Sequence, residues 1–273
     1  MTTPLISAAD LLASSADVVL IDTTWNLVGP PGREAYDAGH LPGAHFVDLE
    51  TELAAPPGKG GRHPLPEATI VEAALRRAGA SNDSAIVVYD AANSMAAARA
   101  WWVFRYFGAT NVRVLDGGLA DWKAAGGAVV TEVPAAGSGS FVAHAGGMPV
   151  LDADAAAERA TNGVLLDARA PERFAGEVEP IDPVAGHIPG AVNAPATANV
   201  VPEGLFLAPE ELRSRFKSLG ADGSTPVGVY CGSGVTAAHE ALALEIAGVE
   251  SDLYVGSWSE WITDSSRPIA TGR

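Results

Sequence analysis

Cys231, the single cysteine of the chain, lies in a stretch whose residue types suit nucleophilic chemistry. Residues 227–237 read Val-Gly-Val-Tyr-Cys-Gly-Ser-Gly-Val-Thr-Ala. The apolar residues 227–230 predict a buried β-strand, and the pattern over 236–247 predicts a helix, so Cys231 falls on the turn between them. A structural cysteine would lie within a strand or helix. A cysteine that follows a strand and opens a glycine-rich turn favours a catalytic nucleophile instead.

The residues after Cys231 indicate how its sulfur is activated. Gly232 and Gly234 flank Ser233, and glycine lets the backbone curl tightly so that its N–H groups converge on one point. We expect that point to be the sulfur. Converging N–H groups and the positive end of the following helix favour the thiolate, which is the nucleophilic form. We expect Val235 and Thr236, with the two glycines, to line the substrate site.

Composition and charge exclude several classes of function. The chain has 273 residues, of which 48% are hydrophobic and 18% charged, as in an ordinary globular protein with about two domains. The formal net charge of −16 argues against nucleic acid or an anionic membrane as a partner. Because that charge also repels small anions, an anionic substrate would need local arginines and backbone dipoles at the site.

Cysteine usage and the N-terminus indicate the compartment. A single cysteine excludes an internal disulfide framework and any cysteine-cluster metal site. No apolar run reaches the roughly 20 residues of a membrane helix, and the first residues have neither a basic region nor an apolar core. The six histidines show no paired-ligand spacing. We therefore expect a cytoplasmic protein without a membrane anchor, a metal or another cofactor.

The two halves of the chain repeat one pattern. Gly-His-Leu-Pro-Gly-Ala at 39–44 recurs as Gly-His-Ile-Pro-Gly-Ala at 186–191. Other landmarks recur in the same order, which indicates a tandem duplication. The matched residues are Asp22 with Asp167, His40 with His187, Tyr89 with Tyr230, and Trp122 with Trp261.

Each half alternates short β-branched strands with helical segments, including 67–79, 94–107 and 209–219. This alternation predicts an α/β fold, a mostly parallel sheet with helices on both faces. Residues 133–149 are rich in Gly, Ala and Ser without a clear period and predict a linker. The predicted domains are therefore 1–132 and 150–273.

The duplication serves as an internal control. Asp90 stands where the second half has Cys231, so the first half is predicted to be non-catalytic. His40 and His187 occur in both halves, and we expect each to satisfy a backbone carbonyl rather than to take part in chemistry. Four tryptophans are expected to be core or interdomain aromatics: Trp101, Trp102, Trp122 and Trp261.

At these motifs the chain resembles the tandem-domain rhodanese family of sulfurtransferases over nearly its whole length. The resemblance rests on the two Gly-His-x-Pro-Gly-Ala motifs, the Asp-Gly-Gly before Trp122, the Gly-Ser-Trp at 256–258 and the cysteine loop. It implies two tandem rhodanese-like domains. The Cys-Gly-Ser-Gly-Val-Thr-Ala loop resembles that of the 3-mercaptopyruvate-specific members. Thiosulfate-preferring members carry basic residues where this chain has Gly232 and Ser233.

The resemblance implies a reaction in two steps. The Cys231 thiolate takes a sulfur atom from 3-mercaptopyruvate and forms a persulfide. A thiol, cyanide or a thioredoxin-like protein then accepts the outer sulfur. Such covalent catalysis predicts ping-pong kinetics.

The resemblance also implies a proton relay for the leaving enolate. Ser233 is placed two residues after the nucleophile. The family positions a histidine and a carboxylate near this serine, which here correspond to His63 and Glu50. From composition alone, residues 58–63 predict a solvated surface loop.

Arg173 matches a substrate-binding arginine of the family, and a guanidinium suits a carboxylate. A surface salt bridge with Glu172 or Glu177 is the alternative. The position of a second family arginine is occupied by Ile181, and Arg62 is a candidate to replace it.

Three other functions remain open. Thiosulfate sulfurtransferase shares the nucleophile and the persulfide. A sulfur carrier or scaffold would retain the fold without turnover. A cysteine phosphatase would need an arginine where the chain has Ala237, which disfavours that class.

Overall fold

The computed structural model describes residues 3–272. The chain forms two compact units. The first unit extends to Ala55 and takes up Leu65–Met148 and Pro202–Phe206. The second unit comprises Pro56–Pro64, Pro149–Val201 and the chain from Leu207 onward. The predicted boundaries at 132 and 150 remain predictions, and residues 56–64 lie with the second unit.

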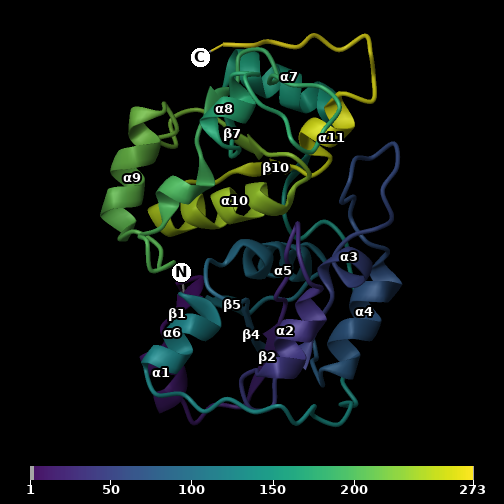
Figure 1. Ribbon diagram of the computed structural model, residues 1–273, viewed down its shortest axis with the longest axis vertical. Coiled ribbons are helices and arrows are strands. Elements are labelled where there is room, and N and C mark those ends of the chain that lie inside the picture. Colours follow the sequence, from purple (N-terminus) through teal and green to yellow (C-terminus); the bar gives the residue numbers. More distant parts are fainter. Residues whose placement is uncertain (1–2, 273) are drawn as a thin grey trace. The chain divides into compact units, whose positions relative to one another are not determined.

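The first unit contains a five-stranded parallel sheet in the order β1-β5-β4-β2-β3 (Figure 1). Its strands are β1 (Leu5–Ile6), β2 (Val18–Asp22), β3 (His45–Phe46), β4 (Ala85–Tyr89) and β5 (Val112–Leu115). Its helices are α1 (Ala8–Ala13), α2 (Gly32–Ala38), α3 (Leu49–Glu52), α4 (Ala68–Arg77), α5 (Met95–Tyr106) and α6 (Gly118–Ala124).

The second unit repeats this topology with the order β6-β10-β9-β7-β8. Its strands are β6 (Val150–Leu151), β7 (Val164–Asp167), β8 (Val192–Asn193), β9 (Val227–Tyr230) and β10 (Asp252–Tyr254). Its helices are α7 (Ala153–Asn162), α8 (Pro171–Phe174), the 3-10 turn η1 (Ala196–Asn199), α9 (Pro209–Ser218), α10 (Val235–Ala247) and α11 (Ser257–Trp261).

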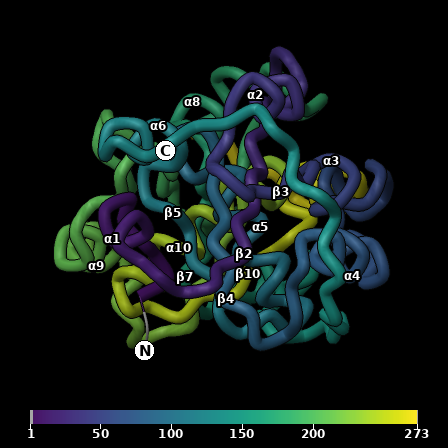
Figure 2. The backbone as a smooth tube through the Cα atoms, turned by 90° about the horizontal axis from the view of Figure 1, so that it is seen from below, coloured from purple at the N-terminus to yellow at the C-terminus, as the bar shows by residue number. Residues whose placement is uncertain are grey.

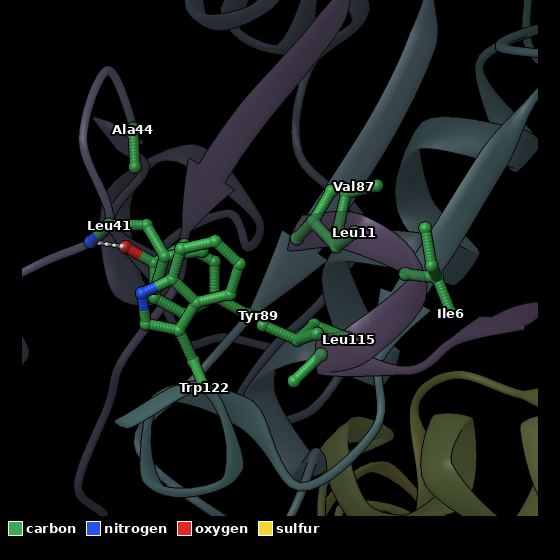
Figure 3. Packing of buried hydrophobic residues seen from close by; sticks show 9 residues of the cluster. Ile6, Leu11, Leu41, Ala44, Val87, Tyr89, Leu115 and Trp122 are labelled. Atoms are coloured by element: carbon green, nitrogen blue, oxygen red, sulfur yellow. Dashed lines mark hydrogen bonds between the residues drawn. The ribbon is translucent and has the colours of Figure 1, made fainter. Parts of the chain in front are cut away.

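The central strands β4 and β9 are almost wholly buried on both faces, because their residues are apolar and side chains alternate between the two faces along a strand. In β4, Val87 and Tyr89 pack with Leu11 of α1 and Trp122 of α6 (Figure 3). The alternate residues of β4 point to the opposite face and are also buried. In the second unit, Leu165 and Tyr230 form the corresponding core with α7 and α11. The predicted α/β fold, with a parallel sheet in each of two units, is confirmed.

Residues 133–149, the predicted linker, contain no helix or strand of their own before Pro149. They nevertheless follow the surface of the first unit, as the teal tube between α6 and α4 in Figure 2 shows. The amide of Gly137 donates to the Arg77 carbonyl at 2.7 Å, and Phe141 is fully buried. The linker is therefore a hydrogen-bonded strap on the first unit.

The histidines shared by the two halves have the predicted structural role. His40 Nδ1 lies 2.8 Å from the Tyr36 carbonyl, and the two rings stack at 3.8 Å. His187 Nδ1 lies 2.7 Å from the Phe174 carbonyl and stacks on that ring at 3.7 Å. Each histidine therefore joins its Gly-His-x-Pro-Gly-Ala turn to the preceding helix. The four tryptophans that were expected to be core or interdomain aromatics are all buried: Trp101, Trp102, Trp122 and Trp261.

Candidate active site

Cys231 lies on the turn between β9 and α10, as predicted. The turn reverses through Gly234, whose φ of 81° is a left-handed value that favours glycine. One amide of the predicted array, Gly234 N–H, donates to Cys231 Sγ at 3.1 Å. The cysteine is 2% exposed. Cys231, the predicted nucleophile, thus lies beside the first turn of a 13-residue helix.

The Gly256-Ser257-Trp258 motif clamps the backbone of the cysteine turn. Cys231 N–H donates to Ser257 Oγ at 3.1 Å, and the Cys231 carbonyl accepts from Trp258 N–H at 3.0 Å. Ser257 adopts a φ of 55°, which is unusual for a residue with a side chain. The Gly232 carbonyl accepts from Ser259 N–H at 2.9 Å. Both ends of the cysteine peptide are therefore immobilised by one segment.

Ser233 and His63 are brought together, although 170 residues separate them. Ser233 Oγ lies 2.7 Å from His63 Nδ1, and both side chains are buried. His63 is therefore not solvated, contrary to what composition predicts, although Gly58 and Lys59 of the same stretch are exposed. A Gly58–Gly61 turn and a hydrogen bond from Arg62 N–H to Ser259 Oγ at 3.0 Å hold the segment in the second unit.

Two guanidinium groups lie next to the cysteine loop. A Cβ atom built on Gly232 would lie 3.0 Å from Arg62 Nη2 and 3.6 Å from Arg173 Nη2. A side chain at position 232 would therefore meet Arg62. The absence of a side chain at Gly232 leaves room for these arginines, which supply positive charge from outside the loop.

Buried carboxylates hold the two arginines. Arg173 donates to Glu179 at 2.7 Å and to Asp182 at 3.1 Å, so its ion-pair partners differ from the Glu172 and Glu177 suggested by sequence. Arg62 forms an ion pair with the other oxygen of Asp182. Burial acts to raise the pKa of Glu179, but hydrogen bonds from Arg173 and from backbone amides lower it below the ordinary value.

A second buried pair supports this cluster from the end of β7. Arg169 Nη2 lies 2.6 Å from Asp167 Oδ2 and 2.7 Å from the Gly186 carbonyl. Its guanidinium carbon lies 4.8 Å from the centre of the Trp258 ring. Burial disfavours the charged guanidinium, yet the Asp167 carboxylate outweighs that effect and raises the pKa of Arg169.

The remaining predicted site residues fall in two places. Val235 and Thr236 begin α10, where Val235 is buried and Thr236 half-buried. Glu50 belongs to the first unit, in the first turn of α3, and accepts a hydrogen bond from Trp25 Nε1 at 2.7 Å. The assignment of Glu50 to the relay remains a prediction.

Several residues of the site were not identified from the sequence. Asp182, Glu179, Ser257 and Ser259 each contact a predicted site residue or its backbone. The sequence offered one signal for the serines. The second half has Gly-Ser-Trp where the first half has Gly-Gly-Leu. The acidic residues gave no comparable signal, because their partners are distant in the chain or look like ordinary surface charges.

Comparison with known proteins identifies the family. The rhodanese-like domain model matches residues 7–125 and 152–264. A Pseudomonas aeruginosa protein named "Probable 3-mercaptopyruvate sulfurtransferase" is 47% identical over 98% of this chain and 98% of its own. A Mycobacterium tuberculosis protein named "Putative thiosulfate sulfurtransferase SseB" is 44% identical over 98% of this chain and 97% of its own.

A solved structure agrees with the sequence relatives. The crystal structure of SseA from Escherichia coli, a 3-mercaptopyruvate sulfurtransferase, superposes with a TM-score of 0.79. The alignment has 34% identity and covers 95% of this chain and all of SseA. No helix within residues 3–272 has both the length and the apolar character that crossing a bilayer requires. The chain belongs to the family of proteins with rhodanese-like domains, as a sulfurtransferase with two such domains.

Proposed function

We propose that this sulfurtransferase takes sulfur from 3-mercaptopyruvate and transfers it, through a persulfide on Cys231, to a thiol, cyanide or a thioredoxin-like protein. The observation that carries this choice of donor is the buried pair of Ser233 Oγ and His63 Nδ1, 2.7 Å apart and two residues from the nucleophile. A hydroxyl bonded to an imidazole is suited to moving a proton.

The first step forms one sulfur–sulfur bond and breaks one carbon–sulfur bond. The Cys231 thiolate attacks the donor's sulfur, and the electron pair of the carbon–sulfur bond remains on carbon as pyruvate enolate. The thiol proton of the donor is transferred by way of Ser233 and His63 to that carbon, leaving pyruvate and a persulfide anion. In the second step, an acceptor such as cyanide takes the outer sulfur and restores the thiolate.

The need for a proton distinguishes the two candidate donors. Thiosulfate would release sulfite, which leaves as a stable dianion and requires no proton. An enolate, by contrast, must be protonated on carbon to become pyruvate. A buried serine–histidine pair beside the cysteine therefore favours mercaptopyruvate. We assign Glu50 to orient His63, and this role rests on the family resemblance.

The persulfide anion would be stabilised by the amides of the cysteine loop and of the first turn of α10. Support comes from the corresponding turn of the first unit, where Asp90 accepts hydrogen bonds from backbone amides including those of Ala96 and Ala97, at 3.0 and 3.1 Å. The same kind of turn thus directs several backbone amides at one acceptor. We assign Arg173 to the donor's carboxylate.

Thiosulfate is the alternative donor, and one observation favours it. Two guanidinium groups lie beside Gly232, and positive charge there suits an anion such as thiosulfate. The relatives reflect both possibilities, since the Pseudomonas aeruginosa protein is named for mercaptopyruvate and the Mycobacterium tuberculosis protein for thiosulfate. For the reduced cysteine that the reaction needs, we propose the cytoplasm as the compartment.

The test compares the two donors with the wild type and with His63→Gln. Intact-protein mass spectrometry after adding mercaptopyruvate should detect one added sulfur atom, and Cys231→Ser should detect none. His63→Gln should lower kcat/KM for mercaptopyruvate roughly 100-fold while changing that for thiosulfate by less than about threefold. A wild type that prefers thiosulfate strongly, or a His63 variant that loses both activities equally, would contradict the proposal.

A further inference from the structure

The two arginines beside Gly232 share one buried acid. The two oxygens of Asp182 contact different guanidinium groups, one on Arg62 and one on Arg173. The Asp182 side chain is 4% exposed, whereas those of Arg62 and Arg173 are 22% and 15% exposed. The acid is therefore sequestered behind the arginines, and solvent or a ligand reaches the guanidinium groups.

The positive charge of this cluster is fully compensated. It contains three arginines, Arg62, Arg169 and Arg173, and three carboxylates, Asp167, Glu179 and Asp182, joined by ion pairs. The region next to the cysteine therefore offers guanidinium hydrogen bonds without a net positive charge. Arg62 Nε is buried and has no hydrogen-bond partner among the described residues.

We propose that Asp182 is a specificity-determining residue that reduces the positive charge of Arg62 and Arg173, so that the site selects a monoanionic donor over a dianionic one. The inference deepens the proposed function and rests on it. Mercaptopyruvate carries one charge at neutral pH, on its carboxylate, whereas thiosulfate carries two.

Coulombic interaction scales with the charge of the ligand. Any change in the local potential therefore affects the dianion twice as strongly as the monoanion. The thiolate of Cys231 and the net charge of −16 already oppose anions. With Asp182 ionised, the arginines bind a carboxylate by hydrogen bonds, but they do not offset the additional repulsion of a second negative charge.

Arg173 has a second carboxylate partner besides Asp182, whereas the ion pair of the Arg62 guanidinium is with Asp182. Arg173 makes three further hydrogen bonds to Glu179, between 2.7 and 3.1 Å. The backbone amide of Arg62 is held by Ser259 Oγ at 3.0 Å. Asp182→Asn keeps the shape and an acceptor oxygen, so the chief change is the loss of one negative charge.

The experiment measures the ratio of kcat/KM for thiosulfate to that for mercaptopyruvate, with cyanide as the acceptor. Asp182→Asn should raise this ratio about three- to tenfold, and Arg62→Gln should lower it by a similar factor. Glu172→Gln is the matched control: it removes the same charge from an exposed residue of α8, and the ratio should stay within about twofold.

Two further variants separate charge from structure. Arg62→Lys keeps the charge and should keep the wild-type ratio, whereas a structural role would make it resemble Arg62→Gln. If Asp182→Asn does not fold, the two Arg62 variants still test the role of charge, because only Arg62→Gln should lower the ratio. Equal changes for both donors in the Asp182 and Arg62 variants would overturn the inference. A wild-type preference for thiosulfate would instead contradict the proposed function, and the shift in ratio would still be measurable.

Discussion

The turn after β4 and the turn after β9 make equivalent backbone hydrogen bonds but carry different side chains. In the first unit, the Asp90 carbonyl accepts from Leu119 N–H at 2.9 Å; in the second, the Cys231 carbonyl accepts from Trp258 N–H at 3.0 Å. The first turn carries a carboxylate and the second a thiol. The comparison separates what the turn does as a backbone structure from what its side chain adds.

The first turn shows that this backbone directs several amides at one acceptor. Asp90 accepts four amide hydrogen bonds of 3.0 to 3.2 Å, from Ala92, Ser94, Ala96 and Ala97. Burial raises the pKa of the Asp90 carboxyl, and these amides oppose the rise. The first unit thus fills the turn with its own side chain. In the second unit, we propose that the shorter cysteine leaves these positions to a transferred sulfur.

Other buried charges also differ between the units. Asp22 ends β2 and Asp167 ends β7, but Arg169 pairs with Asp167, whereas Thr24 occupies the equivalent position beside Asp22. The helices after the two turns bury Arg99 in α5 and Glu240 in α10. The duplicated framework therefore tolerates different ionisable groups, each supported by its own partners.

The largest effect is expected for Cys231→Ser. Combined with Asp90→Cys, this variant tests whether the turn alone suffices for catalysis. Cys231→Ser should lower thiocyanate formation roughly a thousandfold or more, because the nucleophile is lost. Adding Asp90→Cys to that variant should restore nothing, since Ala92 stands where the second unit has Ser233. Mass spectrometry with each donor would check both variants. A persulfide on the cysteine at position 90 would show that the turn alone is sufficient.

The strand-end acids should differ in their contribution to stability. Asp167→Asn leaves Arg169 buried without its principal counter-ion and should cost about 3 kcal/mol of unfolding free energy. Asp22→Asn replaces a carboxyl whose pKa burial raises, and its cost should be less than about 1 kcal/mol at neutral pH. Urea unfolding of the two variants gives the comparison, and equal losses would contradict it.

Asp90→Ala should destabilise the first unit by about 2 kcal/mol, because four backbone amides, three of them in buried hydrogen bonds, lose their acceptor. Asp90→Asn retains one carbonyl oxygen and should lose less. Hydrogen exchange of the amides of Ala96 and Ala97 would localise the effect. Unchanged protection in Asp90→Ala would mean that the carboxylate contributes nothing to the order of this turn.

The buried carboxyl of Glu240 should make the stability of the second unit depend on pH. Burial raises the pKa of Glu240 to about 7, although Arg215 and Asn199 contact it. Because the folded state retains the proton more strongly than the unfolded state, the associated stability is complete below about pH 4.5 and is lost as the pH rises through about 7.

Glu240→Gln should remove this dependence. The unfolding free energy of the wild type should fall by on the order of 1 to 3 kcal/mol more than that of the variant between pH 5 and pH 8. Urea midpoints at several pH values would measure the difference. Parallel pH profiles would mean that Glu240 stays ionised in the folded protein, as an ion pair with Arg215.

The elements that carry Cys231 could be predicted from sequence because their signals are local. The apolar run that predicts a strand at 227–230 coincides with β9, and α10 begins one residue before the predicted helix. Internal repetition likewise predicted the two sheets. The pairing of His63 with Ser233 is not local, and it was expected through family resemblance alone.

The environment of Arg62 could not be predicted for the same reason. Gly58, Lys59, Gly60 and Gly61 read as a flexible loop, because composition reports on local preference and not on distant partners. Gly61 has a φ of 97°, and a Cβ there would lie 2.7 Å from the Gly256 carbonyl oxygen. Gly61 therefore permits close packing against a distant segment, which its local sequence does not distinguish from flexibility.

The position of Pro56–Pro64 has a consequence for the descent of the protein. This short stretch is encoded with the first repeat but lies with the second unit. A fragment starting at Pro149 would carry Cys231 and Arg173 without Arg62 or His63. Recombination that exchanged the C-terminal repeat alone would therefore separate the nucleophile from two of its neighbours, and the two repeats are expected to be inherited together.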